Sequence, residues 1–441
     1  MKKKIIYTLV CLVLVFNIMN AQVLPVVAPQ QDTPLMLTGG NIHTGTGEVL
    51  NGTDIAFKDG KIMAVGTLEG MAEYADYETV DVSGKEVYPG LIFLNTGLGL
   101  TEIGSVDVTV DNSEYGQINP GARAAVAYNT DSHVIPVVRS NGVLLAQVTP
   151  SGGILSGTSS VMQLDAWNWE DAIYSADEGI HLNWPGMAPL RGRRAMYARM
   201  MGGSRSSYED TVEEITELFR DAVAYAEMEK PEKTNQHLEA MKGLFDGSRT
   251  LYIHASEAKS IIASVNFARE YGVKRMVLVG ANEQAWMVKD FIRENEIPLI
   301  LAHVHSMPDN EHSDTRLTFK LAGMFSREGI LTGITYSNQA YGYNLPFVAG
   351  QTVAYGVSKE DALAMVTLNN ARILGIDDRT GSLEEGKDAN IIVSEGDILD
   401  MLGNEVVLAY INGRCIDLDN KHKMLYRRFQ EKYERTEQGD R

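Results

Sequence analysis

Histidines at the ends of apolar segments are the residues of this chain whose type and spacing could support metal chemistry. His254 ends the apolar run that starts at Leu251, while His303 and His305 end the run that starts at Pro298. Side chains two positions apart share one face of a strand, so His303 and His305 can point together. Neutral imidazoles bind Zn²⁺, which makes hydroxide from water near neutral pH. These histidines therefore form one candidate site for metal-dependent hydrolysis.

Other polar side chains are candidates for lining a pocket. His181 stands at an expected strand end, where a hydrogen-bonded structural histidine is the simpler interpretation. Tyr336, Tyr341 and Tyr343 belong to an uncharged polar segment after the last expected strand. Such a segment could bind a small, neutral, polar ligand.

The elements that must position these side chains alternate between strand and helix. Strands are expected at 251–254, 275–279, 298–302 and 330–335, and helices at 258–271, 284–295 and 314–328. Alternation of this kind predicts a parallel sheet with crossover helices. The length suits an α/β fold of the (β/α)8 TIM-like barrel type, with functional residues at the C-terminal ends of the strands.

Both ends of the expected barrel are rich in short strands. Asp59-Gly60 and Asn412-Gly413 are two-residue turns typical of β-hairpins. Neither end has enough strands for a stable sheet of its own, so we expect the two to pair into one small β-sandwich. The expected organisation is residues 35–88 and 380–418 for this composite domain, 89–379 for the barrel, and 419–441 for a C-terminal helical tail.

The first 21 residues have the pattern of a secretory signal peptide. Lysines at positions 2–4 precede an apolar run from Ile5 to Phe16, and Ala21 is a small residue suited to cleavage. This run is too short to span a bilayer. Residues 22–34 then read as a linker. We expect export to the periplasm or the cell exterior, with no stable membrane insertion after cleavage.

Charge and cysteine content restrict the partners and the chemistry. The formal net charge is −19, which opposes binding to nucleic acid. Of the two cysteines, Cys11 lies in the signal segment, which leaves only Cys415 after cleavage. Neither an intrachain disulfide nor a cysteine-based zinc site is therefore expected.

Several motifs resemble the amidohydrolase superfamily, close to its exported, imidazolonepropionase-like branch. Pro89-Gly90-Leu91-Ile92 is similar to the start of the first barrel strand, and Asn369–Gly375 resembles a short helix late in the fold. Gly381-Ser382-Leu383 through Asn390 is similar to the C-terminal signature. The resemblance implies a hydrolase of carbon–nitrogen bonds built on a barrel with a composite β-sandwich. It also implies a divalent metal, most often zinc, with ligands on the first, fifth and sixth strands and a catalytic aspartate on the eighth.

Most of those ligand positions carry other residues here. Asn95 and Gly97 stand where the resemblance implies the first-strand histidine pair, and Ser337 or Asn338 stands at the aspartate position. Residues 277–282, on the sixth strand, contain no histidine. Only His254, on the fifth strand, remains as a remnant. One imidazole cannot hold zinc tightly, because zinc sites use three or four protein ligands.

Three functional interpretations remain open from the sequence. The favoured one is a chain that is catalytically impaired in isolation, without a cofactor, acting as a pseudoenzyme that partners an intact paralogue or forms a homo-oligomer. The alternative is an active hydrolase of carbon–nitrogen bonds with one divalent metal, most simply zinc, at a rearranged site around His254, His303 and His305. A third is a binding protein for a small polar ligand.

Overall fold

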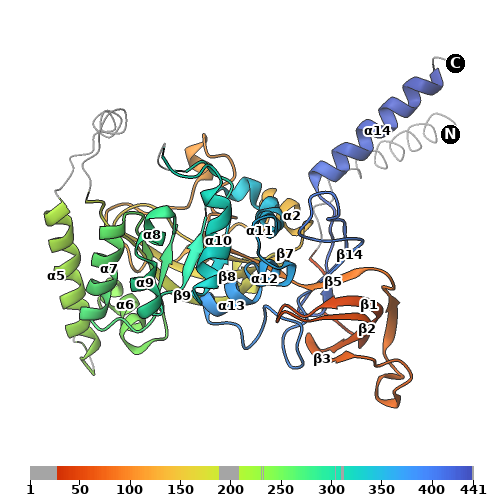
Figure 1. Ribbon diagram of the computed structural model, residues 1–441, viewed down its shortest axis with the longest axis horizontal. Helices are drawn as coiled ribbons and strands as arrows, with labels where there is room; N and C mark the ends of the chain where they lie inside the picture. The colour runs from red at the N-terminus through yellow and green to blue at the C-terminus, as the bar shows by residue number, and fades with distance from the viewer. Residues whose placement is uncertain are drawn as a thin grey trace, which may run out of the picture.

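The computed structural model describes residues 27–187, 208–229, 231, 233–302, 304–308 and 312–439. Two eight-stranded sheets organise these residues. One sheet lies in the barrel, and the other belongs to a smaller domain beside it (Figure 1). The expected signal peptide, residues 1–21, and the first part of the expected linker lie outside the described residues.

The barrel sheet follows the chain from its first strand to its last. Its order is β13-β12-β11-β10-β9-β8-β7-β6. The strands are β6 (Leu91–Thr96), β7 (Val143–Val148), β8 (Leu155–Gln163), β9 (Ile173–Asn183), β10 (Thr250–His254), β11 (Met276–Val279), β12 (Leu299–Leu301) and β13 (Thr332–Ile334). Together with the helices that follow, this arrangement confirms the expected α/β barrel class.

One strand departs from the all-parallel sheet that the sequence favoured. β8 pairs antiparallel with both β7 and β9, whereas the other pairs in this sheet are parallel. The connection between β7 and β8 is a short turn in which Gly152 and Gly153 have φ of 84° and 65°. A parallel neighbour needs a crossover of about a dozen residues or more, which this turn does not supply.

Helices follow the later strands and cover the outside of the barrel (Figure 1). They are α5 (Tyr208–Ala226), α6 (Gln236–Asp246), α7 (Ala258–Glu270), α8 (Glu283–Met287), α9 (Lys289–Glu294), α10 (Leu317–Arg327), α11 (Leu345–Val353), α12 (Lys359–Ala364) and α13 (Leu368–Leu374). The single helix expected at 284–295 is two helices, because Val288 leaves helical geometry at φ −116° and ψ 23°. No helix within the described ranges is long and apolar enough to cross a membrane.

Shorter elements lie between these strands and helices. They are η1 (Ala72–Tyr74), η2 (Asp107–Thr109), η3 (Ala124–Ala127), α2 (Val134–Arg139), α3 (Trp169–Ala172) and η4 (Gln339–Asn344).

The barrel is closed between β6 and β13 by a side chain and by the chain before α13. Asn370, on α13, donates from Nδ2 to the carbonyl oxygens of Ile92 (2.8 Å) and Ile334 (3.1 Å), one on each edge strand. The backbone N–H groups of these two residues donate to Val366 and Met365 respectively. Asn370 is fully buried. The carbonyl oxygens of Ile92 and Ile334 therefore have a hydrogen-bond donor, although no backbone ladder pairs β6 with β13 within the described residues.

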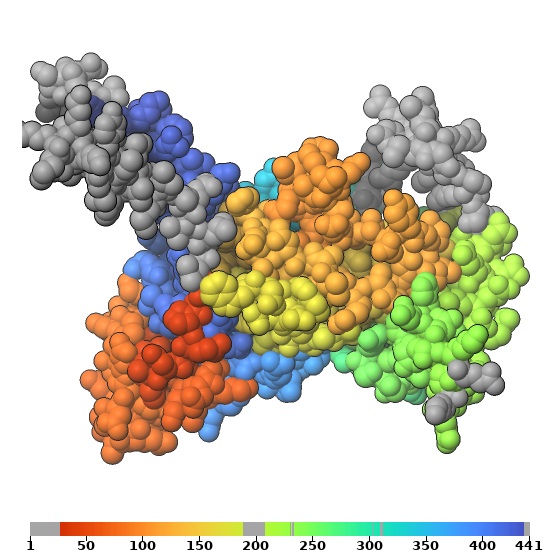
Figure 2. Space-filling model, turned by 180° about the vertical axis from the view of Figure 1, so that it is seen from behind, coloured from red at the N-terminus to blue at the C-terminus, as the bar shows by residue number. Residues whose placement is uncertain are grey.

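The smaller domain combines both ends of the chain, as expected (Figure 2). Its strand order is β16-β15-β14-β5-β1-β2-β3, with β4 also paired to β1. The strands are β1 (Leu35–His43), β2 (Val49–Lys58), β3 (Lys61–Gly66), β4 (Glu78–Asp81), β5 (Glu86–Pro89), β14 (Ile391–Ser394), β15 (Val406–Ile411) and β16 (Arg414–Cys415).

This sheet folds over to enclose its own core. Phe57 on β2 contacts Tyr410 on β15 with ring centroids 5.0 Å apart, although three strands separate β2 from β15 in the sheet. Both expected hairpin turns are confirmed. Asp59 and Asn412 have φ of 51° and 48°, each followed by a glycine that also has positive φ.

Helix α14 (Lys421–Gly439) forms the C-terminal tail and points away from both domains (Figure 1). Its side chains from Lys421 to Arg435 are exposed, apart from the half-buried Leu425.

Candidate functional site

The C-terminal ends of the barrel strands bring Asn95 and His254 to one small cavity. This cavity has a volume of about 190 Å³, and Thr149, Ser156 and Asn183 also line it. Asn95 has φ of 45°, and its backbone N–H donates to Oε1 of Gln147 at 2.9 Å. The first-strand position Asn95 and the fifth-strand position His254 therefore face the same cavity.

His254 is paired with a second histidine rather than with a carboxylate. Its Nε2 lies 2.9 Å from Nδ1 of His181, and Nε2 of His181 lies 2.9 Å from Oγ of Ser159. His181 is fully buried and stacks on Tyr252, with ring centroids 4.7 Å apart. His181 therefore uses both ring nitrogens in hydrogen bonds inside the barrel.

Burial keeps both imidazoles neutral. Burial lowers the pKa of His254 to about 4, and burial together with the nearby His254 lowers the pKa of His181 well below its usual range. One of the two rings must donate to the other through the shared hydrogen bond. The pair therefore acts as a single hydrogen-bonded unit near neutral pH.

A buried glutamate organises the polar residues below this pair. Glu178 Oε1 accepts from Nε2 of Gln147 (2.8 Å) and from Oγ of Ser159, and its Oε2 accepts from the hydroxyl of Tyr252 (2.8 Å). Burial raises the pKa of Glu178, although these three donors act in the opposite direction. Sequence analysis did not single out Glu178, Gln147 or Ser159. Of the three, only Gln147 stands out in the sequence, as a polar residue within the apolar strand β7.

The sixth and eighth strands supply no replacement ligand. Val277 and Val279 belong to the buried apolar cluster inside the barrel. Ser337 and Asn338 are exposed in the segment after β13, and Oδ1 of Asn338 accepts from the N–H of Ala340, which caps η4. Ser337 and Asn338 therefore do not line the cavity that contains His254.

The three tyrosines of the last loop do not converge on His254 either. Tyr336 is half-buried against the main core, whereas Tyr341 is 51% exposed. Tyr341 and Tyr343 contact each other with ring centroids 6.2 Å apart. Neither the 190 Å³ cavity nor the larger cavity described below has any of the three in its lining.

His303 and His305 are the two histidines that the sequence offered for a rearranged metal site. His303 lies outside the described residues. His305 is exposed, and its ring packs edge-on against Phe319 at 6.0 Å.

The residues around His254 do not fit a hydrolytic metal centre. Nε2 of His254 is engaged with His181, and the carboxylate of Glu178 already accepts from three donors. No group of three or more histidine, cysteine, aspartate or glutamate side chains suited to a metal occurs among the described residues. A catalytic zinc needs three protein ligands and an open position.

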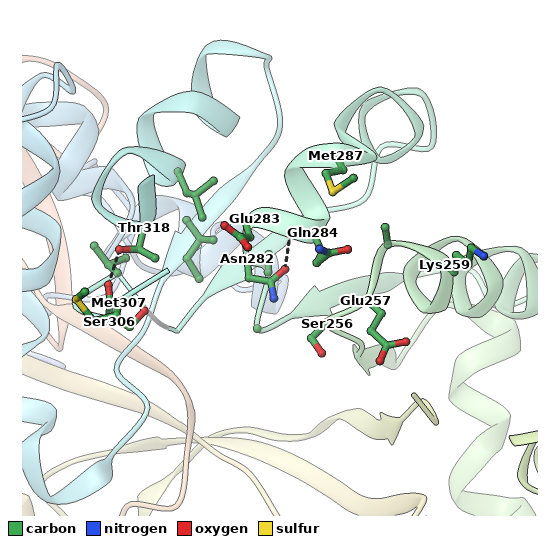
Figure 3. A pocket seen from close by; sticks show the side chains of 16 residues that line it. Ser256, Glu257, Lys259, Asn282, Glu283, Gln284, Met287, Ser306, Met307 and Thr318 are labelled. Carbon is green, nitrogen blue, oxygen red and sulfur yellow. Dashed lines mark hydrogen bonds between the residues drawn. The ribbon is translucent and has the colours of Figure 1, made fainter. Parts of the chain in front are cut away.

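A larger cavity of about 1120 Å³ opens beside this site, over the ends of β10, β11 and β12 (Figure 3). Asn282, Glu283 and Gln284 start α8 in its middle, with Ser256 and Glu257 on one side and Ser306 and Thr318 on the other. Both carboxylates have partners in the wall. Oε2 of Glu257 accepts from the N–H of Met187 (3.0 Å), and Oε2 of Glu283 accepts from Oγ of Ser313 (2.6 Å). Lys259 adds a cationic side chain to the amides and hydroxyls of the lining, which therefore suits a polar ligand.

A barrel with polar groups at its strand ends and a domain built from both chain ends is the architecture of the amidohydrolases. The family model described as the Amidohydrolase family matches residues 154–416. The protein belongs to this family, which confirms the resemblance seen in the sequence.

Three comparisons define how close the likeness is. The imidazolonepropionase of Thermoplasma volcanium is 28% identical over 209 residues, which are 46% of this chain and 49% of that protein. The match thus spans about half of that relative. The crystal structure of an amidohydrolase from Thermotoga maritima has a TM-score of 0.76 at 23% identity, covering 87% of this chain and 99% of that one. A putative prolidase from Bifidobacterium longum has a TM-score of 0.53 at 19% identity, covering 89% and 97%. Both structures support the fold alone.

Proposed function

We propose that this chain is an exported amidohydrolase-family barrel that does not hydrolyse substrates by itself. It acts instead as a non-catalytic partner of an intact relative or in a homo-oligomer. The observation that carries the proposal is the state of the fifth-strand histidine. His254 is the ligand position that survives, and it is hydrogen-bonded to His181, which lies above a Glu178 carboxylate that accepts from Gln147, Ser159 and Tyr252.

The strand ends support the same conclusion. A water-activating metal requires several convergent ligands, and here the corresponding positions carry Asn95, Gly97, Ser337 and Asn338. Export is supported by the signal-peptide pattern of residues 1–21.

Metal content is the measurement that tests this proposal. We expect the purified mature chain to contain far less than one metal per chain by inductively coupled plasma mass spectrometry, even after loading with zinc or manganese. A content near one metal per chain that is lost in the His254→Ala variant would contradict the proposal. It would favour the alternative, an active hydrolase with a rearranged site, to be assayed on dipeptides and cyclic amides.

A double variant provides the positive control. Asn95→His/Gly97→His restores the first-strand pair beside His254. A Cβ at Gly97 would lie 3.9 Å from its nearest neighbour, the side chain of Gln339, and histidine tolerates the positive φ at position 95 better than most residues. We expect this variant to bind more zinc than the wild-type chain. Equal zinc in both would mean that the first-strand losses do not explain the missing metal.

The large cavity favours ligand binding as a retained role of the barrel. A polar ligand that binds there raises the melting temperature by mass action. We expect compounds that bear amides and hydroxyls to raise it in the wild-type chain, and to raise it less in Gln284→Ala/Thr318→Ala. These two side chains line the large cavity, and His254 is not part of its lining.

A further inference from the structure

Helix α14 presents a stripe of aromatic side chains to solvent. Tyr426 is 71% exposed, Phe429 is 49% exposed and Tyr433 is 62% exposed. Their spacing of three and then four residues places them on one face of the helix. Lys432 lies over the rings of Phe429 and Tyr433 at 5.8 and 5.7 Å and covers only one edge of the stripe. A row of exposed aromatic rings on one helix face is typical of an interaction surface.

The helix is fixed at its base, so the direction of this stripe is set by the fold. Asn420 is 9% exposed, donates from Nδ2 to Oγ of Ser140 at 3.0 Å, and accepts from the N–H of Lys423 at 3.0 Å. Leu418 packs against the main core just before it. Arg427 then pairs with Asp419 at 2.5 Å across the first turns. Beyond this anchor α14 extends away from the rest of the molecule (Figure 1).

Basic side chains occur in both halves of α14, with Lys432 and Arg435 in the second half, whereas its described acidic side chains lie in the second half alone. Lys421, Lys423, Arg427 and Arg428 lie in the first half, where residues 421–430 contain no acidic residue. The acidic side chains described on this helix, Glu431 and Glu434, lie in the second half. The whole chain, by contrast, carries a net charge of −19. The first half is thus a basic segment on an acidic protein.

We propose that the stripe of Tyr426, Phe429 and Tyr433 is the interface through which two copies of this chain pair, with their α14 helices antiparallel. In this arrangement Tyr426 of one copy faces Tyr433 of the other, and Phe429 lies across from Phe429 at the two-fold axis. The basic first half of each helix lies beside the second half of the other, which contains Glu434. Such self-complementarity is what a two-fold symmetric interface requires.

The projecting geometry favours the antiparallel direction over the parallel one. A 19-residue helix is roughly 28 Å long at 1.5 Å per residue. Antiparallel pairing places the second molecule at the far tip of the first helix, where it has room. Parallel pairing would bring two large domains together at the same base. A helix pair of this size makes a small interface, so the dimer is expected to be weak and reversible.

A membrane surface fits the same helix less well. The acidic charge of the whole chain, −19, disfavours anionic lipid, although basic side chains outnumber acidic ones on α14 itself. Pairing through α14 does not depend on whether the barrel hydrolyses substrates. The metal measurement and the dimerisation measurement therefore test the two proposals independently.

Sedimentation of the mature full-length chain tests the interface. We expect the average mass to rise toward that of a dimer across roughly 1–200 µM, the range of weak interfaces. Tyr426→Ser/Phe429→Ser/Tyr433→Ser should remain monomeric over that range. Met424→Ser/Glu431→Ser/Arg435→Ser changes the opposite face of the same helix and should dimerise like the wild-type chain. A monomeric wild-type chain, or a dimer that survives the stripe variant, overturns the proposal.

Disulfide trapping tests whether the two α14 helices pair antiparallel or parallel. It leaves two of the three aromatic rings in place in each chain. In a Cys415→Ser background, a mixture of Tyr426→Cys and Tyr433→Cys chains should form a cross-linked heterodimer on mild oxidation. Each variant alone should cross-link poorly. Efficient cross-linking of either variant with itself would show parallel pairing and contradict the arrangement. Co-sedimentation with phosphatidylcholine–phosphatidylglycerol vesicles that the stripe variant abolishes would assign the stripe to lipid and also overturn it.

Discussion

At the scale of single residues, the centre of this barrel is organised around a network of buried hydrogen bonds. Glu178 satisfies Gln147, Ser159 and Tyr252, and Ser159 in turn bonds His181. Each of these groups is buried, so a lost partner leaves an unpaired polar atom that costs free energy. The network therefore stabilises the interior of the barrel.

Glu178→Gln should lower the free energy of unfolding by about 2–3 kcal/mol, because its amide N–H₂ would meet donors where the carboxylate accepts. Urea unfolding followed by circular dichroism measures this change. Glu170→Gln, at an exposed glutamate on the neighbouring α3, is the matched control and should change little. Equal stability of Glu178→Gln and wild type would rule out a structural role for the network.

His254 should titrate far below an ordinary histidine. Its pKa is about 4 against the usual 6.5, because burial disfavours the charged ring. The unfolded chain then binds more protons than the folded chain below pH 6.5, so the contribution of this residue to stability falls as the pH drops toward 4. Ring-proton NMR gives the midpoint directly. A midpoint near 6.5 would mean that the ring is exposed to solvent.

At the scale of elements, α13 closes the barrel through one side chain. Asn370 bridges Ile92 and Ile334, and its Oδ1 would lie only 2.2 Å from a Cβ at Gly333. Gly333 therefore allows the close approach of α13 to β13. This contact explains why the Asn-Asn-Ala-Arg segment at 369–372 is a structural part of the fold as well as a sequence signature.

Asn370→Ala should destabilise the fold by about 2–4 kcal/mol, because two buried carbonyl oxygens lose their donor. Asn369→Ala is the comparison, since Asn369 makes a single bond to the carbonyl of Thr332 at 3.0 Å from a half-buried position. We expect its effect to be clearly smaller in the same chemical unfolding experiment. A reversed order would contradict the closure role.

At the scale of the whole molecule, His43 joins the small domain to the barrel. Its Nδ1 lies 2.7 Å from Glu360 on α12, and its Nε2 lies 2.9 Å from Glu86 on β5. Because ionised carboxylates only accept, both ring nitrogens donate when the ring is an imidazolium. Tyr88 stacks on the ring at 4.3 Å, and the ion pair of Lys359 with Asp397 lies beside it.

The charge state of His43 makes this joint pH-dependent. Burial lowers the pKa of His43, but the bonds to Glu360 and Glu86 outweigh it and leave the pKa raised above 6.5. The folded state then binds the proton more tightly than the unfolded state. The stabilisation is fully present below pH 6.5 and is lost as the pH rises through the raised pKa.

His43→Gln should therefore cost about 1–2 kcal/mol at pH 6 and less at pH 9, because two charge-assisted hydrogen bonds are lost only at the lower pH. Thermal unfolding at both pH values measures the difference. His422→Gln, at an exposed histidine of α14, is the control and should change the melting temperature little. Equal losses at pH 6 and pH 9 would show that His43 stabilises the joint without titrating.

The sequence by itself determined the family, the barrel and the composite small domain. These features reside in local patterns: glycine turns, apolar strands, and residue types at fixed offsets. Only the tertiary structure revealed that His254 pairs with His181, that β8 is reversed, that Asn370 closes the barrel and that His43 joins the domains. The bonds of His254, Asn370 and His43 link residues 73, 278 and 317 positions apart. A local pattern indicates which face of an element is buried, whereas the partner on that face is set by how distant segments pack.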